Sequence, residues 1–214
     1  MKGKFIVIEG IDGSGKTTQI NQLSKWLKET IPKNKKIIIT REPGGTELGQ
    51  SIRSLLLDSS KDKSPSSITE LLLYAADRAQ HVDEIIRPSL ENGDWVISDR
   101  FCGSTIAYQG YGRKLDIQLI KNLETIATQG LYPDITILLD IPVEESIKRR
   151  ISKENDRIEQ EGKDFLAKVS LGFQILSKEL TWKKVSAIKP KEEITSEIQF
   201  EITKLLNKQI KENQ

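Results

Sequence analysis

The stretch Gly10-Ile11-Asp12-Gly13-Ser14-Gly15-Lys16-Thr17 decides the fold of this chain. It fits the pattern G-x-x-x-x-G-K-[ST], in which glycines let the backbone wrap around phosphate oxygens. An apolar run at residues 5–8 precedes it, and apolar residues at helical spacing follow it from Lys16 to about Thr30. A strand, a glycine-rich loop and a helix in this order predict a phosphate-binding loop at a helix N-terminus. We expect Lys16 to hold the β- and γ-phosphates of a nucleotide and Thr17 to offer its hydroxyl to Mg²⁺.

The spacing of the glycines separates this loop from other nucleotide-binding loops. It is not the G-x-G-x-x-G of dinucleotide-binding folds, so an NAD-binding fold is disfavoured. The Asn-Lys-x-Asp sequence by which GTPases usually bind guanine is also missing from the chain. The loop by itself does not distinguish a small-molecule kinase from a switch or a motor ATPase.

Short apolar runs alternate with segments of helical spacing along the whole chain. The expected strands are 5–8, 36–40, 95–98, 135–139 and, more weakly, 184–188, and the expected helices are 16–30, 48–57, 67–92, 115–129, 143–151, 162–180 and 192–211. Near-continuously apolar strands that alternate with helices are typical of a parallel sheet with helices on both faces. We therefore expect an α/β fold with a five-stranded parallel sheet in one domain, residues 1–214. Pro88 should kink the long helix or split off its last turn.

The composition fits such a domain and excludes several other classes of protein. The chain has 214 residues, 36% of them hydrophobic and 30% charged, and its formal net charge is +2. A near-neutral chain argues against a nucleic-acid polymer as the partner. The single cysteine, Cys102, excludes an internal disulfide and a multi-cysteine zinc site. No apolar run reaches the roughly 20 residues of a membrane helix and no secretory cleavage site follows the N-terminus, so we expect a cytoplasmic protein with no membrane partner.

Charged residues follow the second and third expected strands, at the sheet edge where parallel sheets bind ligands. Arg100 ends a central strand and is well placed to hold an acceptor phosphate, because a guanidinium fork suits a phosphate better than an ammonium does. Asp99 is the natural carboxylate for Mg²⁺, through water, since Mg²⁺ keeps much of its hydration shell. The alternatives are an ion pair for Arg100 and a capping role without metal for Asp99.

Four stretches of the chain resemble the thymidylate kinase family, whose members phosphorylate dTMP to dTDP with ATP. They are Thr40-Arg41-Glu42-Pro43-Gly44-Gly45-Thr46, Trp95-Val96-Ile97-Ser98-Asp99-Arg100, Ser104-Thr105 with Ala107-Tyr108-Gln109-Gly110, and Asp156-Arg157-Ile158-Glu159. The resemblance covers nearly the whole chain. It implies the P-loop NTPase fold of nucleoside-monophosphate kinases, with ATP and dTMP as substrates, Mg²⁺ as cofactor and a homodimer as the assembly. It also implies direct in-line transfer, in which the acceptor phosphate needs no general base.

The resemblance implies an acceptor site built from residues of several loops and one helix. Its members are Asp12, Arg41, Tyr74, Arg78, Arg100, Thr105, Tyr108 and Gln109. Tyr74 takes the place of an aromatic residue that stacks on thymine, and Arg78, four residues later on the same helix face, would hydrogen-bond the base. The family more often has Phe there, so the Tyr74 hydroxyl needs a partner. Tyr108 would cover the sugar and exclude a ribose hydroxyl, and Asp12 would approach the 3′-hydroxyl.

A basic segment at about residues 149–162 resembles the short lid that closes over ATP in this family. The phosphate loop has no arginine after Asp12, so the resemblance implies that the lid supplies the catalytic arginine, as in the bacterial type. Arg149, Arg150 and Arg157 are the candidates. Arg150 and Arg157 are favoured, and with Lys16 and Arg100 they complete the expected catalytic set. The simpler alternative is a solvated charged surface.

Several residues near these motifs allow more than one interpretation. Arg41 would contact substrate or brace its loop, and Glu42 would orient Arg41 or a water molecule. His81 is expected at the surface or behind the site, and Cys102 is expected to be a small packing residue. Two rival functions also stay open: another nucleoside or nucleoside-monophosphate kinase, for instance one acting on dUMP, and a regulatory ATP-binding switch without an acceptor site.

Overall fold

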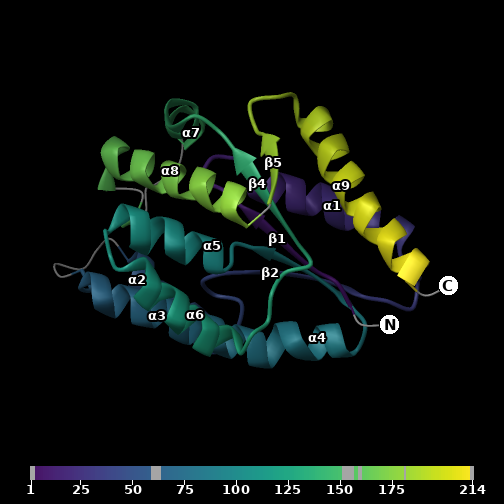
Figure 1. Ribbon diagram of the computed structural model, residues 1–214, viewed down its shortest axis with the longest axis horizontal. Coiled ribbons are helices and arrows are strands. Elements are labelled where there is room, and N and C mark those ends of the chain that lie inside the picture. Colours follow the sequence, from purple (N-terminus) through teal and green to yellow (C-terminus); the bar gives the residue numbers. More distant parts are fainter. Residues whose placement is uncertain (1–2, 59–63, 151–156, 159–160, 181, 213–214) are drawn as a thin grey trace.

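Five parallel strands form the centre of the computed structural model (Figure 1). Their order in the sheet is β2-β3-β1-β4-β5. Their bounds are β1 (Phe5–Glu9), β2 (Ile37–Arg41), β3 (Trp95–Asp99), β4 (Ile135–Asp140) and β5 (Lys183–Ser186). The structure describes residues 3–58, 64–150, 157–158, 161–180 and 182–212. All four pairings between neighbouring strands are parallel, which confirms the expected sheet.

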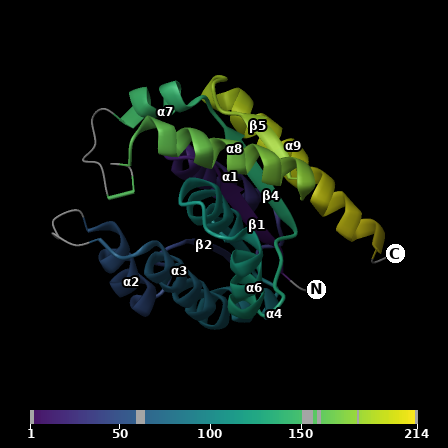
Figure 2. The same ribbon diagram turned by 60° about the vertical axis from the view of Figure 1, so that its left-hand side comes forward.

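Helices cover both faces of this sheet (Figures 1 and 2). On one face α1 (Lys16–Thr30) packs against α9 (Lys191–Glu212). The remaining helices are α2 (Glu47–Leu57), α3 (Ser67–His81), α4 (Arg87–Glu91), α5 (Cys102–Thr105), α6 (Ile117–Thr128), α7 (Val143–Arg150) and α8 (Lys163–Glu179), with the π-helical turns η1 (Val82–Ile86) and η2 (Ile106–Gly112). Among the described helices, none combines the length and the apolar character needed to cross a membrane.

The alternation of side chains along β1 assigns the polar residues at its end to a face. Ile6 and Ile8 belong to the large core cluster, which includes residues of α1 and α9, whereas Phe5 and Val7 pack with Val82 and other residues of the opposite face. Successive side chains of a strand point to opposite faces. Glu9 therefore lies on the face of Phe5 and Val7, under α5.

The long helix expected at residues 67–92 is interrupted near its end. The chain is α-helical to His81, π-helical in η1 and α-helical again in α4. The backbone N–H of Arg87 bonds to the carbonyl of Val82, five residues back, just before Pro88. Pro88 has no N–H to donate, so a wider turn there keeps the remaining bonds in place. The expected effect of Pro88 is confirmed.

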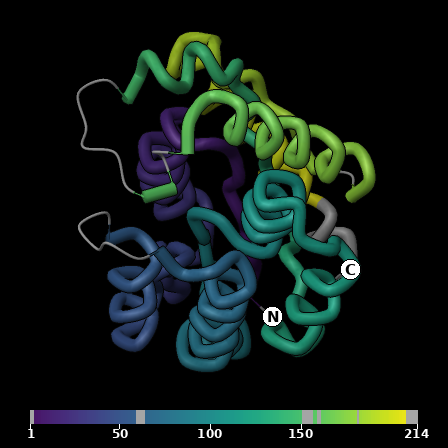
Figure 3. Tube along the Cα trace, turned by 90° about the vertical axis from the view of Figure 1, so that its left-hand side faces the viewer, coloured from purple at the N-terminus to yellow at the C-terminus, as the bar shows by residue number. Residues whose placement is uncertain are grey.

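One helical region was not expected from the sequence. Residues 102–112 form α5 and η2 although they include three glycines, which are weak helix formers. These glycines allow close packing, because a Cβ on Gly112 would lie 2.6 Å from Phe165, and one on Gly103 would lie 2.3 Å from Trp182. Figures 2 and 3 show α8 lying across this helical region. Tertiary packing thus overrides local propensity here.

A buried residue of β3 tests this arrangement of the core. Ile97 is 0% exposed, whereas Ile188 is 60% exposed. We expect Ile97→Ala to lower the free energy of unfolding by about 2–5 kcal/mol, because the deletion leaves a cavity. The matched variant Ile188→Ala should change it by less than about 0.5 kcal/mol. Urea unfolding measures both, and equal losses would contradict the assignment of the core.

Candidate active site

The phosphate loop is held in a backbone conformation that favours glycine. Gly10, Gly13 and Gly15 have φ values of 143°, 80° and 90°. A Cβ on Gly13 would lie 2.6 Å from the carbonyl oxygen of Ser146, so α7 packs directly on the loop. The Ser146 hydroxyl donates to the carbonyl of Asp12 at 2.6 Å. The loop is therefore positioned by β1, α1 and α7 together.

Two buried side chains of the loop are placed to donate to phosphate oxygens. The Nζ of Lys16 donates to the carbonyls of Gly10 at 3.0 Å and Ile11 at 3.3 Å. Burial and the nearby charge of Arg100 lower the pKa of Lys16. The Ser14 hydroxyl is buried and has no hydrogen-bond partner among the described residues. A phosphate oxygen would satisfy the Ser14 hydroxyl and would accept the remaining N–H of the Lys16 ammonium group.

Thr17 and Asp99 line one hollow beside the start of α1. The Oδ1 atom of Asp99 is buried and finds no hydrogen-bond partner within the described residues. A hydroxyl and a carboxylate are the oxygen ligands that Mg²⁺ accepts, so these residues fit the ion. Three or more His, Cys, Asp or Glu side chains do not gather into a metal site anywhere in the described chain.

Arg41 is the one expected acceptor residue that lies apart from the others. It is exposed and lines the hollow of Thr17 and Asp99, not the pocket that contains Tyr74 and Arg78. Arg41 therefore lies beside the expected Mg²⁺ site and not in the acceptor pocket.

Arg100 connects the phosphate loop to the helical region of residues 102–112. Its guanidinium donates to Asp12 Oδ1 at 2.7 Å, to the Ser104 hydroxyl at 2.9 Å and to the Tyr108 hydroxyl at 3.2 Å. Arg100 adopts a positive φ of 74°, which turns the chain sharply after β3. Burial opposes ionisation of Asp12, but the charges of Arg100 and Lys16 lower its pKa below the ordinary value.

Glu9 positions Arg100 indirectly, because both side chains hydrogen-bond to the Ser104 hydroxyl. It accepts hydrogen bonds from the backbone N–H groups of Phe101 at 3.0 Å and Ser104 at 3.1 Å, and from the Ser104 hydroxyl at 2.6 Å. Burial raises the pKa of Glu9 to about 7, although Arg100 and these hydrogen bonds act in the opposite direction. The sequence analysis did not predict Glu9 or Ser104 as site residues. The signal that could have indicated Glu9 is its position as a polar residue at the end of an apolar strand.

A single pocket collects most of the expected acceptor residues. Its lining includes Asp12, Tyr74, Arg78, Arg100, Thr105, Tyr108 and Gln109. Tyr74 is half-buried on α3, and the Arg100 guanidinium lies 5.0 Å from the centre of the Tyr108 ring. The sequence missed Arg53, Leu57 and Ile158, which also line the pocket. Arg53 and Leu57 lie four residues apart on α2, but nothing in the sequence shows that this helix faces the site.

Arg78 is held by two carboxylates at the wall of this pocket. It is 1% exposed, and its guanidinium pairs with Glu42 at 2.7 Å and with Glu124. Its Nη1 also donates to the Thr105 hydroxyl at 2.8 Å. The orientation of Arg78 toward the pocket is therefore set before any ligand binds.

The structure gives Glu42 partners that were not expected, and it places His81 behind the site, which is one of its two expected positions. The two oxygens of Glu42 contact Arg78 and the Nδ1 atom of His81, the latter at 2.8 Å, and not the expected neighbour Arg41. His81 is 0% exposed and lies behind the site, with its other ring nitrogen 2.7 Å from the Thr40 hydroxyl. Cys102 is partly buried against the cluster of Phe5, as expected for a packing residue.

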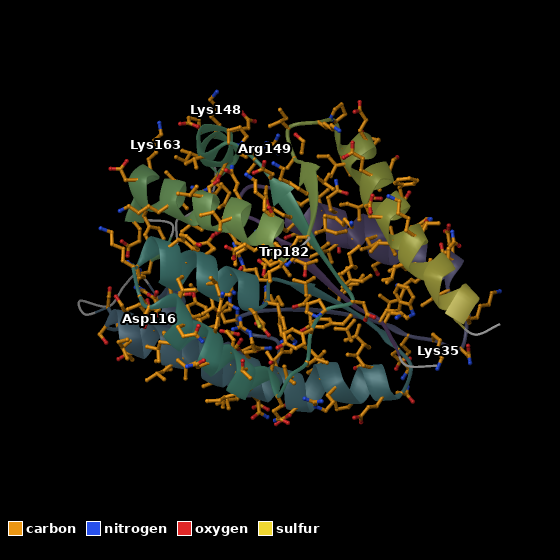
Figure 4. The ribbon with its side chains drawn as sticks, viewed as in Figure 1. Lys35, Asp116, Lys148, Arg149, Lys163 and Trp182 are labelled. Carbon is orange, nitrogen blue, oxygen red and sulfur yellow. The ribbon has the colours of Figure 1, made fainter. Side chains whose placement is uncertain are left out.

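The three arginines expected in the lid contact three different parts of the protein. Arg150 is buried, and its Cγ would lie 3.3 Å from a Cβ on Gly13 of the phosphate loop. Arg149 donates to the carbonyl of Ala187 at 3.0 Å, and Arg157 pairs with Glu70. Figure 4 shows Lys148, Arg149 and Lys163 around the end of α7 and the start of α8. Most of the remaining expected lid, 151–156 and 159–160, lies outside the described residues.

Comparisons with known proteins agree on one family. The sequence profile of the family described as thymidylate kinase matches residues 8–198. The chain is 74% identical over 208 residues to the thymidylate kinase of Prochlorococcus marinus strain NATL1A, which covers 96% of this chain and 99% of that protein. It is 53% identical over 204 residues to that of strain MIT 9313, which covers 94% of each. Among solved structures, a thymidylate kinase from Ehrlichia chaffeensis is 38% identical, with a TM-score of 0.70 over 87% of this chain and 93% of that chain.

The raised pKa of Glu9 predicts a pH-dependent stability. The ordinary pKa of Glu9 is 4.5 and the folded value is about 7, so the folded state binds its proton more tightly than the unfolded state does. This contribution is complete below pH 4.5 and is lost as the pH rises through 7. Urea unfolding of the wild type and of Glu9→Gln at each pH measures the difference in their free energies of unfolding. We expect the wild type to lose a few kcal/mol at most relative to Glu9→Gln as the pH rises through this range. Parallel pH profiles for the two proteins would contradict this role.

Proposed function

The chain belongs to the thymidylate kinase family, and from this premise we propose that it transfers the γ-phosphate of ATP directly to dTMP. We infer that it acts in the cytoplasm, as a single kinase domain with a bound Mg²⁺. The observation that carries the proposal is the pocket in which Tyr74, Arg78, Tyr108 and Arg100 converge next to the phosphate loop. It offers an aromatic face, a buried base-reading arginine and a phosphate-binding arginine in one place.

The acceptor is recognised along the length of this pocket. Thymine stacks on Tyr74, and its edge faces Arg78, with Thr105 and Gln109 beside it. The ring of Tyr108 covers the sugar and leaves no room for a 2′-hydroxyl, which favours deoxynucleotides. Asp12 then approaches the 3′-hydroxyl, and Arg100 takes the phosphate, for which its fork of N–H donors is suited.

The donor lies across the phosphate loop. The loop backbone, Lys16 and the Ser14 hydroxyl bind the phosphates of ATP. Thr17 and Asp99 would hold Mg²⁺, which neutralises charge on the β- and γ-phosphates when it is bound. Arg150, which packs against the loop, is the better placed of the lid arginines to neutralise the phosphoryl group in transit.

These residues act by positioning and by electrostatics. The nucleophile is already a phosphate anion, so neither a general base nor a covalent intermediate is needed. The site must hold two anionic substrates in line and keep water from replacing the acceptor. Lys16, Arg100 and Arg150 reach it from three separate segments and together offset the repulsion between the phosphates.

A comparison of acceptors tests the proposed function. We expect ATP-dependent product formation with a higher kcat/KM for dTMP than for dUMP, dCMP or thymidine, measured by chromatography of the nucleotides. Arg100→Lys should lower kcat/KM for dTMP roughly a hundredfold, because one ammonium cannot replace the fork. The matched control Arg87→Lys, whose guanidinium donates to the Thr128 carbonyl away from the pocket, should keep wild-type activity. A competitor with a higher kcat/KM, or ADP release that dTMP does not stimulate, would refute the proposal.

We also propose that the protein is a homodimer formed through α2, α3 and α6. These helices contact one another in that order (Figure 1). Each of them exposes large apolar side chains. They are Leu48 and Leu55 on α2, Ile68 and Leu72 on α3, and Leu119 and Ile126 on α6. Large apolar side chains exposed on three neighbouring helices favour a protein interface at this surface.

The oligomeric state of one charged variant tests this interface. Leu72 is 51% exposed on α3, and Leu171 is 52% exposed on α8. Leu72→Glu should yield a monomer in size-exclusion chromatography with light scattering, because it would bury a carboxylate against a second copy. Leu171→Glu should remain dimeric. A monomeric wild type, or a dimeric Leu72→Glu, would overturn the proposed interface.

A further inference from the structure

One buried carboxylate, Glu70 on α3, joins three separate segments of the chain. It is 1% exposed and accepts hydrogen bonds from Gln109 at 2.9 Å and from Arg113 at 3.2 and 3.3 Å. It also accepts a hydrogen bond from the guanidinium of Arg157, which comes from the lid. An amide of the acceptor pocket and an arginine of the lid therefore share one carboxylate.

Arg157 contacts the body of the protein at two further points. Its Nε donates to the carbonyl of Leu56 at 2.8 Å, and its backbone N–H lies 3.4 Å from the carbonyl of Leu57. The next residue, Ile158, is 5% exposed and forms part of the wall of the acceptor pocket. These contacts place residues 157–158 against α2 and α3, which lie below α7 and α8 in Figure 3.

A second ion pair ties the far end of the lid to the same cluster. Arg113, which contacts Glu70 directly, also pairs with Glu161. The cluster therefore runs Arg157–Glu70–Arg113–Glu161, with alternating positive and negative charges. The charges balance only while Glu70 is ionised. Burial opposes that ionisation, but the hydrogen bonds from Arg113, Arg157 and Gln109 lower the pKa of Glu70 below its ordinary value. Without the charge of Glu70, the guanidinium groups of Arg113 and Arg157 would repel each other at close range.

We propose that Glu70 is a positioning residue that holds residues 157–158 of the lid against the acceptor pocket, with Arg157 as the anchor. Arg157 acts through Glu70 and does not touch the transferring phosphoryl group. The same carboxylate orients Gln109, so the segment that lines the base pocket and the segment that closes it depend on one group. This inference rests on the proposed function and identifies a residue that the sequence did not single out.

Loss of the anchor has a chemical consequence. An undocked lid takes Ile158 out of the pocket wall and admits water to the phosphoryl group of ATP. Water then attacks the γ-phosphorus, the bond to the β,γ-bridging oxygen breaks, and ADP, inorganic phosphate and a proton are released. The ratio of ATP hydrolysis to dTDP formation therefore reports on docking, whereas a general loss of stability lowers both rates together.

The test compares Glu70→Gln with the wild-type protein under conditions in which both are folded. The substitution keeps the shape of the side chain and removes its charge. We expect kcat/KM for dTMP to fall roughly tenfold or more, and the ratio of phosphate release to dTDP formation to rise. Arg157→Met, which leaves Glu70 paired with Arg113, should raise the same ratio. The double variant should be no worse than the more impaired single variant, because both substitutions remove the same ion pair between Glu70 and Arg157.

The matched control is Glu144→Gln, which removes the same charge from an exposed pair beside the lid. Glu144 and Lys163 lie 2.8 Å apart, and both side chains are 60% exposed, so this variant should behave as wild type. A hydrolysis ratio unchanged in Glu70→Gln and Arg157→Met, or losses that multiply in the double variant, would overturn the role of Glu70. A wild-type protein that forms no dTDP would instead overturn the proposed function.

Discussion

The site depends on ion pairs that neutralise two largely buried arginines beside the carboxyl ends of the strands. Arg78 is 1% exposed and lies against Glu42 and Glu124, and Arg100 lies against Asp12. An unpaired charge in such surroundings is costly, so each guanidinium takes the orientation that its carboxylates allow. These pairs join segments far apart in the sequence, and they hold the cations of the pocket in place before a nucleotide binds. Preorganised charge of this kind is what phosphoryl transfer requires.

Most of the framework could be predicted from the sequence because its signals are local. The glycines and Lys16 of the phosphate loop stand between a strand and a helix, and the order of strands and helices indicates a parallel sheet. Tyr74 and Arg78 could be paired because they are four residues apart on a helix. Asp99 and Arg100 could be placed because the carboxyl ends of parallel strands meet at one edge.

The rest could not be predicted because it depends on contacts between distant segments. The helix at residues 102–112 has poor local propensity and forms because its glycines pack against α8 and Trp182. From the sequence, Glu42 was expected to orient Arg41 or a water molecule, but the fold pairs it with Arg78 from a distant segment. Glu70 looks like an ordinary charged residue in the first turn of α3, and the sequence does not show that the fold brings Arg157 to it.

The most direct test of the proposed function is a crystal structure of the protein with dTMP and a non-hydrolysable ATP analogue. The proposal predicts thymine stacked on Tyr74 with its edge toward Arg78, and the acceptor phosphate bound by Arg100. A dTMP molecule outside this pocket, or one whose phosphate does not contact Arg100, would contradict it.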